Sequence, residues 1–290
     1  MKILLTGKNG QVGWELQRTL APLGEVVAVD RLKLDLGNPD SIRSVIREVK
    51  PDLIVNPAAH TAVDKAESEP ELAMAVNGIA PGVMAEEAKK LGAAMVHYST
   101  DYVFDGTKTS PYTEEDIPNP INVYGKTKLA GEQAIQAVGI PHLILRTSWV
   151  YGARGKNFLL TILRLAKERD ELKIVDDQLG APTWSRMIAE ATAQILAQSV
   201  SPLTPHPSLL TQYGGIYNLT AAGRTSWCGF TQAILENAQV GTRAIPITSA
   251  DYPLPAPRPL FSLLASDKLA KTFGLKLPSW EDSLALCMAR

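Results

Sequence analysis

A tyrosine and a lysine four positions apart, Tyr124 and Lys128, are the pair in this sequence best suited to proton transfer. The segment that continues through Leu129, Ala134 and Ile135 predicts a helix, so the two side chains share one helix face. A tyrosine with its ordinary pKa of about 10 is a poor acid–base catalyst at neutral pH, but a nearby lysine ammonium lowers that pKa. The pair could therefore donate a proton to a carbonyl oxygen.

Polar residues at the end of one predicted strand support that interpretation. The segment 98–102, with the sequence Tyr-Ser-Thr-Asp-Tyr, closes an apolar run over 94–99 that is typical of a strand buried on both faces. In open α/β sheets, ligands bind beyond the carboxyl ends of the strands. We therefore expect Thr100 and Asp101 to lie in the same site as the tyrosine–lysine pair.

Three glycines occupy the corner between the first predicted strand, 2–5, and a predicted helix over 11–20. Gly7 would permit the tight turn, Gly10 a close approach of the backbone to a pyrophosphate, and Gly13 close packing of the helix. Free N–H groups at the helix N-terminus would face the anion. The ATP-binding P-loop requires a GxxxxGK[ST] pattern, which is missing after these glycines. The corner therefore predicts a dinucleotide site.

The end of the next predicted strand, 25–29, bears on the choice of dinucleotide. Asp30 could accept a hydrogen bond from the adenosine ribose, which favours NAD because the 2′-phosphate of NADP would face its negative charge. Arg31, directly after it, could pair with that phosphate instead. NADH and NADPH both stay open as cofactors.

Short apolar runs alternate with longer segments of helical periodicity, which predicts an α/β fold of βαβ units with helices on both faces of a parallel sheet. The clearest helix covers 42–49, where apolar residues recur on one face after Asp40 and Ser41, its expected cap. The predicted strands are 2–5, 25–29, 53–56, 94–99, 142–146, 173–175, 216–219 and 244–247.

We expect a dinucleotide-binding part chiefly over 1–150, and a smaller substrate-binding α/β part over 151–290 that is interleaved with late elements of the first. Two long segments, 105–122 and 199–215, read as loops, because prolines in the second forbid a continued helix. The proline-rich run 253–259 reads equally well as a stiff lid or as a linker.

Composition narrows the classes of function. The 290 residues are 45 % hydrophobic with a formal net charge of −1, so the chain can bury a sizeable core but offers no broad positive field for a nucleic acid. Its two cysteines form neither a disulfide framework nor a metal-binding pattern. Neither a secretory signal nor an apolar run of roughly 18 residues is found. These features predict a soluble, cytoplasmic protein without nucleic-acid or membrane partners.

Together with the segment 58–61 (Ala-Ala-His-Thr), Asn77 and Ser99, these motifs resemble the extended short-chain dehydrogenase/reductase family over nearly the whole chain. The resemblance implies a Rossmann-like, doubly wound parallel sheet. The chain resembles one branch of the family more closely, the branch that reduces 4-keto sugar nucleotides. This closer resemblance implies NAD(P)H-dependent reduction of dTDP-4-dehydro-6-deoxy-L-mannose to dTDP-L-rhamnose for polysaccharide biosynthesis. The blocks that resemble this branch are 10–16, 59–67, 99–104, 146–151 and 177–183.

The resemblance also implies roles at individual positions. Tyr124 would donate the proton, Lys128 would lower the pKa of Tyr124 and anchor the nicotinamide ribose, and Asn77 would support Lys128 through water. Thr100 would polarise the substrate carbonyl. The implied substrate contacts are Thr100, Asp101 and Trp149. The implied cofactor contacts are Gly7, Gly10, Gln11, Val12, Gly13, Asp30, Arg31, Asp35, Leu36, Ala58, Ala59, His60, Tyr98, Tyr124 and Lys128.

Single residues bear on the other functions that similar proteins have. Sugar-nucleotide dehydratases carry a glutamate where this chain has Tyr102, and the loss of that carboxylate removes an elimination base. Epimerases use the same Thr–Tyr–Lys set, so a related 4-keto reductase or epimerase is one alternative. Another is a non-catalytic dinucleotide-binding regulatory subunit, like the partner of methionine adenosyltransferase that resembles this branch.

A homodimer is an open expectation. Some members of the branch are described as magnesium-linked dimers, and Glu15 matches one of the glutamates involved. Arg186 stands where a second carboxylate would be expected, and its charge would repel a divalent cation or form a direct salt bridge instead. We expect no metal among the catalytic residues and leave Mg²⁺ at a subunit interface open.

Overall fold

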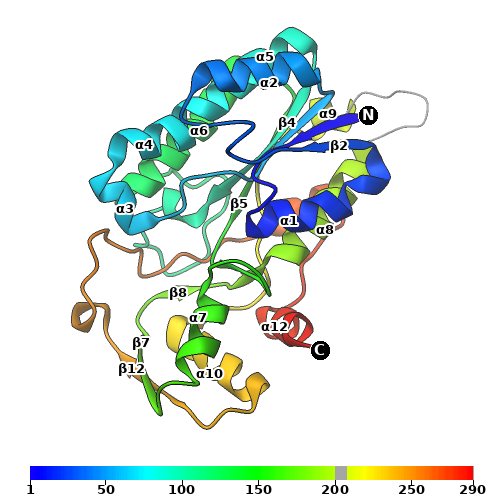
Figure 1. Ribbon diagram of the computed structural model, residues 1–290. Coiled ribbons are helices and arrows are strands. Elements are labelled where there is room, and N and C mark those ends of the chain that lie inside the picture. Colours follow the sequence, from blue (N-terminus) through cyan, green and yellow to red (C-terminus); the bar gives the residue numbers. More distant parts are fainter. Residues whose placement is uncertain (200–207, 290) are drawn as a thin grey trace.

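The computed structural model describes residues 1–199 and 208–289, which form an α/β fold around a six-stranded parallel sheet (Figure 1). The strand order is β10-β5-β4-β3-β1-β2, so the direction of the chain across the sheet reverses at β1. Ligands of such sheets bind outside the carboxyl ends of the strands at this reversal. The predicted doubly wound fold is confirmed, and it places a binding crevice next to the glycine corner.

The strands of this sheet agree with the predicted ones to within a residue at each end. They are β1 (Lys2–Leu5), β2 (Glu25–Ala28), β3 (Leu53–Asn56), β4 (Ala94–Thr100), β5 (His142–Thr147) and β10 (Gly215–Asn218). The other two predicted strands pair with each other outside it, as β7 (Glu171–Val175) and β12 (Arg243–Ile247). Two short pairs complete the strands, namely β6 (Val150–Tyr151) with β9 (Thr183–Trp184), and β8 (Leu179–Gly180) with β11 (Thr225–Ser226).

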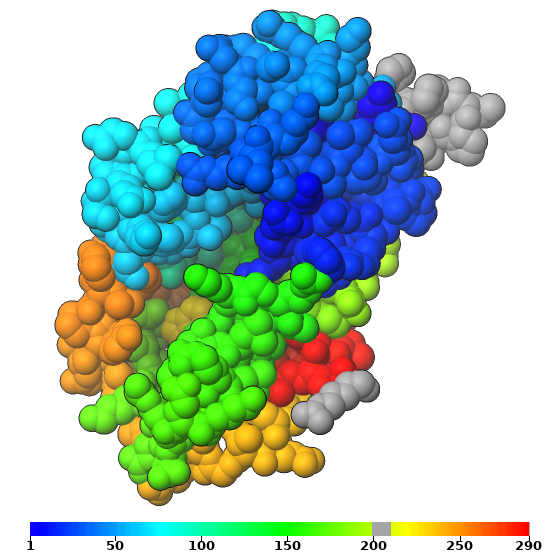
Figure 2. All heavy atoms as spheres, in the orientation of Figure 1, coloured from blue at the N-terminus to red at the C-terminus, as the bar shows by residue number. Residues whose placement is uncertain are grey.

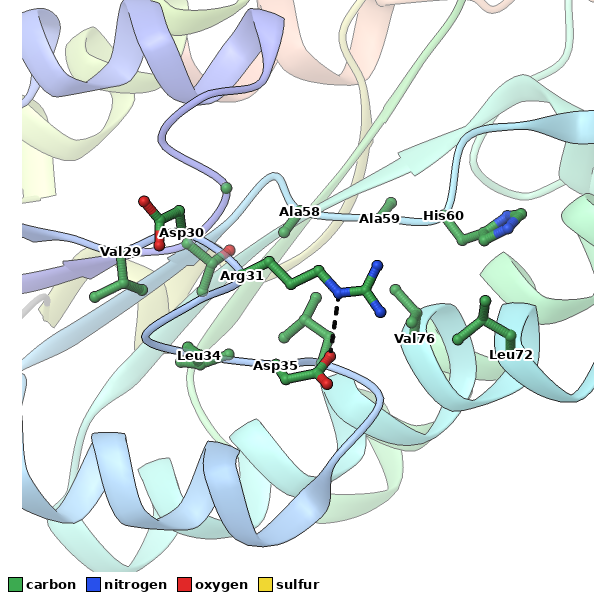
Figure 3. Close-up of a pocket in the computed structure, with 13 residues that line it drawn as sticks. Val29, Asp30, Arg31, Leu34, Asp35, Ala58, Ala59, His60, Leu72 and Val76 are labelled. Carbon is green, nitrogen blue, oxygen red and sulfur yellow. Dashed lines mark ion pairs between the residues drawn. The ribbon is translucent and has the colours of Figure 1, made fainter.

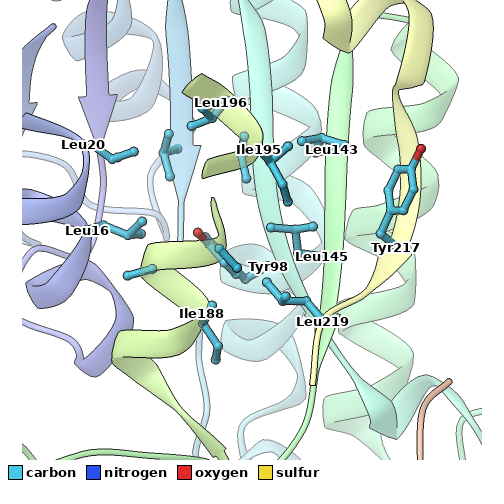
Figure 4. Close-up of a cluster of buried hydrophobic side chains, with 14 of the residues drawn as sticks. Leu16, Leu20, Tyr98, Leu143, Leu145, Ile188, Ile195, Leu196, Tyr217 and Leu219 are labelled. Carbon is cyan, nitrogen blue, oxygen red and sulfur yellow. The ribbon is translucent and has the colours of Figure 1, made fainter. Parts of the chain in front are cut away.

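Helices cover both faces of the central sheet because alternate strand residues point to opposite faces. Ile3 and Leu143 face α1 and α8 (Figure 4), whereas Leu4 and Ile144 face α2 and α5. Below the sheet in Figure 1, α10 packs against β7 and β12, and α7 and α12 both pack against α10. The helices are α1 (Gln11–Thr19), α2 (Pro39–Val49), α3 (Val63–Ser68), α4 (Pro70–Met74), α5 (Ala80–Leu91), α6 (Val123–Val138), α7 (Phe158–Leu165), α8 (Ser185–Ser199), α9 (Ser208–Tyr213), α10 (Trp227–Ala238), α11 (Asp267–Phe273) and α12 (Trp280–Met288).

Two details of the predicted local structure are wrong. The cap of α2 is Asn38, whose side chain accepts hydrogen bonds from the amides of Asp40 and Ser41, because Pro39 starts the helix earlier than expected. The predicted loop 199–215 contains α9, which packs against α8 and β5. The rest of that loop, 200–207, lies outside the described residues.

The proline-rich run 253–259 is tied to the amino-terminal part of the chain. The Asp64 carboxylate accepts from the Arg258 guanidinium at 2.9 Å and from the Ala256 amide at 3.2 Å. The Asn122 amide donates to the carbonyl oxygen of Pro257 at 2.9 Å. Because Asn122 also caps α6, the run 253–259, which we call the strap, lies next to the first turn of the helix that carries the tyrosine–lysine pair.

Candidate active site

A cleft opens at the carboxyl ends of the central strands, and the surface is hollowed there between the early and late parts of the chain (Figure 2). Its walls come from the glycine corner after β1, the segments after β3 and β4, the start of α6, and the segment after β5. Loop residues 155–157 and Trp227 close its far side. The fold therefore brings the glycine corner, Thr100 and the tyrosine–lysine pair into one site.

The glycine corner has the geometry of an anion cradle. Gly7 has a φ of +59°, and the backbone N–H of Gly10 donates to the carbonyl oxygen of Gly7 at 2.9 Å. No side chain caps the N-terminus of α1 at Gly10, so its first N–H groups stay available to an anion in the cleft. Gln11, which lines the same wall, is bonded to Asn157 at 2.9 Å. These residues fit the pyrophosphate of a dinucleotide.

Gly13→Ala is expected to weaken dinucleotide binding at least about 10-fold and to destabilise the protein by about 1–3 kcal/mol. The reason is steric, because a Cβ at Gly13 would lie 2.1 Å from the carbonyl oxygen of Gly7. Fluorescence titration with NADPH and urea denaturation would measure both effects. The matched control is Gly241→Ala, where the added methyl meets no atom within 4 Å; equal behaviour of the two variants would contradict the prediction.

A second pocket adjoins the cleft on the side of β2, and Figure 3 shows the side chains that line it. Asp30 is paired with Lys8 at 3.0 Å, and this hydrogen bond to Lys8 lowers the pKa of the Asp30 carboxyl. Arg31 is paired with Asp35 at 3.7 Å. The remaining predicted cofactor contacts here, Leu36, Ala58, Ala59 and His60, also line this pocket. Sequence reasoning missed Lys8, which offsets the charge of Asp30.

Asn77 holds the segment after β3 in place through its side-chain amide. Asn77 lies in a π-helical turn (Ala75–Ile79), and its side-chain amide bonds both backbone groups of His60, at 2.8 and 3.0 Å. It also donates to the hydroxyl of Thr127 at 3.2 Å. Asn77 therefore fixes the wall of the pocket, and its support of Lys128 through water stays a prediction.

Tyr124 sits at the first turn of α6 with its ring at the edge of Tyr102, at a centroid distance of 5.8 Å. Burial raises the pKa of the Tyr124 phenol to about 12, while a hydrogen bond with Thr100 opposes that rise. Thr100 also donates to Asp101 at 2.9 Å. A phenol with this pKa is protonated at neutral pH, and an efficient proton donor needs that pKa brought back towards the working pH.

Lys128 of the same helix is almost fully buried, and burial lowers the pKa of its ammonium to about 8. Its Nζ atom donates to the carbonyl oxygen of Tyr98 at 2.6 Å and lies 3.1 Å from Nε2 of His97. Desolvation of the phenol dominates the pKa of Tyr124 here, and its lowering by Lys128 together with an oxidised nicotinamide stays a prediction. Tyr98 lines the cleft, and its hydroxyl is bonded to Thr192 at 2.8 Å.

Two tryptophans line the same cleft. Trp149 has a φ of +46° and stacks on Trp227, with ring centroids 3.6 Å apart and an interplanar angle of 5°. Trp227 donates from its indole N–H to Gln178 at 3.2 Å. Trp149 was expected in the site from the sequence. Trp227 was not, because it comes from a distant helix and carries no motif of its own.

A protein-family model described as the RmlD substrate binding domain matches residues 1–290 of this chain. The chain belongs to this family. A curated relative from Burkholderia thailandensis, named dTDP-4-dehydrorhamnose reductase, is 50 % identical over 296 residues, which cover 99 % of this chain and 98 % of the relative.

Solved structures of proteins with the same name resemble this RmlD-family chain over its length. The structure of a dTDP-4-dehydrorhamnose reductase from Clostridium acetobutylicum matches with a TM-score of 0.91 at 38 % identity, covering 99 % of this chain and 98 % of that one. The Bacillus anthracis enzyme, whose structure is a complex with NADP, matches with a TM-score of 0.89 at 34 % identity over 99 % and 98 %.

Two residues of this RmlD-family chain that were not expected in the site, Ser262 and Arg258, contact expected ones or their neighbours. Burial raises the pKa of the Asp101 carboxyl to about 6, and hydrogen bonds from Ser262 and Thr100 oppose the rise. Ser262 follows the strap, and the strap residue Arg258 is paired with Asp64. The Arg258–Asp64 pair joins positions 194 apart, and Ser262 and Asp101 are also far apart in the sequence, so no local pattern could have revealed these contacts.

Glu15 and Arg186 form a salt bridge within the chain at 3.4 Å. Over 1–199 and 208–289, no group of three or more His, Cys, Asp or Glu side chains could hold a metal ion. The same described ranges contain no helix long and apolar enough to cross a membrane.

Proposed function

We propose that this RmlD-family chain is a dTDP-4-dehydrorhamnose reductase, which reduces the C4 keto group of dTDP-4-dehydro-6-deoxy-L-mannose to give dTDP-L-rhamnose. The observation that carries the proposal is one cleft that holds a dinucleotide cradle together with a buried, protonated tyrosine beside a threonine and a lysine. The identity of 50 % to a named relative over nearly the full length supports the same substrate.

The chain's own residues prepare the carbonyl and supply the proton. A bound nicotinamide dinucleotide would supply the hydride. Thr100 donates a hydrogen bond to the substrate carbonyl and polarises it, and Tyr124 transfers its phenolic proton to the same oxygen. Lys128 anchors the nicotinamide ribose and stabilises the phenolate that Tyr124 leaves behind. Asp101 and the stacked Trp149 bind the sugar nucleotide.

The two parts of the chain divide these tasks in our proposal. Residues 1–150, with the later strand β10, hold the dinucleotide in the pocket of Figure 3. Segments from 151–290 supply the substrate wall, through Trp227 and the strap 253–259. The strap acts as a fixed rim of the substrate site.

The test is an absorbance assay of nicotinamide oxidation with purified protein, NADPH or NADH in parallel, and the keto sugar made in situ from dTDP-glucose by the upstream enzymes. Substrate-dependent oxidation is expected with both cofactors. Tight cofactor binding without oxidation would favour a non-catalytic regulatory subunit. Oxidation only with a different keto sugar nucleotide would favour a related reductase or epimerase.

Both cofactors fit the ribose end of the pocket, and Arg31 is the residue expected to discriminate between them. Lys8 neutralises Asp30, so the 2′-phosphate of NADPH meets no net negative charge there, and Arg31 can pair with that phosphate. Arg31→Ala is expected to raise the KM for NADPH about 3- to 10-fold and to leave that for NADH unchanged. Initial rates with each cofactor measure this.

The matched control is Arg43→Ala, which removes an equally charged side chain that is paired with Asp40 on the surface of α2. The KM for both cofactors should stay unchanged in this variant. An equal rise for NADPH and NADH in Arg31→Ala would remove Arg31 from the recognition of the 2′-phosphate.

A further inference from the structure

Three polar side chains lie in a row across the central sheet and end at the catalytic lysine. Thr6 follows β1, Asn56 ends β3, and His97 lies in β4 directly opposite Asn56 in the strand register. The hydroxyl of Thr6 is 2.6 Å from Oδ1 of Asn56, and Nδ2 of Asn56 is 3.1 Å from Nδ1 of His97. Nε2 of His97 is 3.1 Å from Nζ of Lys128.

This row is isolated from water and from most charge. Thr6, Asn56, His97 and Lys128 are each at most 2 % exposed. Burial and the charge of Lys128 lower the pKa of the His97 imidazole well below its ordinary value, so the ring stays neutral. The charged groups nearest to it are Lys128 and Glu132 of α6, and Glu132 is neutralised by a buried ion pair with Arg146 of β5.

Every member of the row can either donate or accept a hydrogen bond. A threonine hydroxyl, an asparagine amide and a neutral imidazole each carry both functions, and the imidazole exchanges them by changing its tautomer. In the described orientation, Nδ2 of Asn56 donates to Nδ1 of His97, so the ring hydrogen lies on Nε2 and can be donated to a neutral lysine amine. An ammonium instead needs Nε2 as an acceptor, and the row supplies it when the Asn56 amide turns over, so that Oδ1 accepts from Nδ1 and Nδ2 donates to Thr6. The contact with the Tyr98 carbonyl serves a donor only.

We propose that His97, held by Asn56 and Thr6, is a positioning residue that keeps Nζ of Lys128 in place in both charge states of the amine. The inference rests on the proposed reductase function, in which Lys128 acts beside Tyr124. A lysine whose pKa lies near 8 populates both states close to neutral pH. A partner that fits only one state would release the side chain in the other.

The direct test is an NMR titration of Lys128 in protein without cofactor, with ¹³C-labelled lysine and the signal assigned by Lys128→Met. His97→Leu removes the partner of Nζ in both charge states, and because a hydrogen bond to the ammonium is worth more than one to the neutral amine, the pKa of Lys128 is expected to fall below its wild-type value. His97→Gln returns an amide that can donate or accept and is expected to restore it. His142→Leu, the same change at the first residue of the neighbouring strand β5, should leave the pKa of Lys128 unchanged.

Turnover provides a second readout. Loss of a hydrogen bond to a charged group predicts a fall in kcat of about 10- to 100-fold in His97→Leu, with an unchanged KM for the sugar nucleotide. The alkaline limb of the pH profile should move to lower pH, because the lysine ammonium is lost earlier as the pH rises. An unshifted alkaline limb, with or without a lower kcat, would overturn the proposal.

Two further outcomes are decisive. If His97→Leu does not fold, Thr6→Val is the replacement variant, because it removes the hydroxyl at the far end of the row. We expect the pKa of Lys128 to fall in Thr6→Val as well. An unchanged pKa of Lys128 in this variant would overturn the proposal. A wild-type protein that titrates as expected but does not turn over the keto sugar would refute the proposed function and leave the role of His97 in holding Lys128 intact.

Discussion

Tyr124→Phe is expected to lower kcat by about 10²- to 10⁴-fold, the usual contribution of a positioned general acid, while the affinity for the dinucleotide changes little. The phenol is buried, its pKa is raised to about 12, and it lies at the start of α6 beside Thr100 and Asp101. Phenylalanine keeps the ring against Tyr102 and removes only the proton that the substrate oxygen would receive.

Stopped-flow or steady-state oxidation of NADPH measures this loss, and fluorescence titration measures cofactor binding. Tyr217→Phe is the matched control, because its hydroxyl donates to the Tyr213 carbonyl away from the cleft. Turnover of that variant should stay close to wild type. Near-normal turnover of Tyr124→Phe would show that another group donates the proton.

Arg146→Met is expected to lower the free energy of unfolding by about 3–5 kcal/mol, because it leaves a buried carboxylate without its partner. Arg146 of β5 donates to Glu132 of α6 through Nε at 2.9 Å and through Nη2 at 2.6 Å. Both side chains are at most 2 % exposed, and the guanidinium lies over the ring of Phe104. The pair connects the central sheet to the helix that carries Tyr124 and Lys128.

Urea denaturation measures the loss. Arg164→Met is the matched control, since Arg164 is paired with Glu168 on the exposed face of α7, and its removal should cost about 0–1 kcal/mol. The double variant Arg146→Met with Glu132→Leu should recover much of the stability, because it removes the orphaned charge. Equal losses in the single and double variants would place the effect in packing instead of charge.

Local patterns in the sequence predicted the parts of this fold that depend on neighbours along the chain. The six strands of the central sheet were predictable because they read as short apolar runs, and β3 and β4 among them are buried on both faces. The glycine corner was predictable because a positive φ at Gly7 and the close packing at Gly13 both require glycine. Tyr124 and Lys128 share a helix face because their spacing matches the helical period.

Direct contacts between residues distant in the sequence could not be predicted. Asn77 bonds the backbone of His60, and Lys128 bonds His97 and Tyr98. Trp227 joins the cleft only because α10 packs beside the segment after β5. The rise in the pKa of Tyr124 follows from burial, which no spacing of residues reports.

The sequence by itself determined which side chains are available for the chemistry and which segments form strands and helices, since both depend on residue type and on short-range periodicity. The tertiary structure alone decided which of these side chains meet. It set Thr6, Asn56 and His97 in one row, because neighbours across a parallel sheet come from strands that are far apart along the chain. It also decided the protonation of the buried groups, because desolvation depends on everything packed around them.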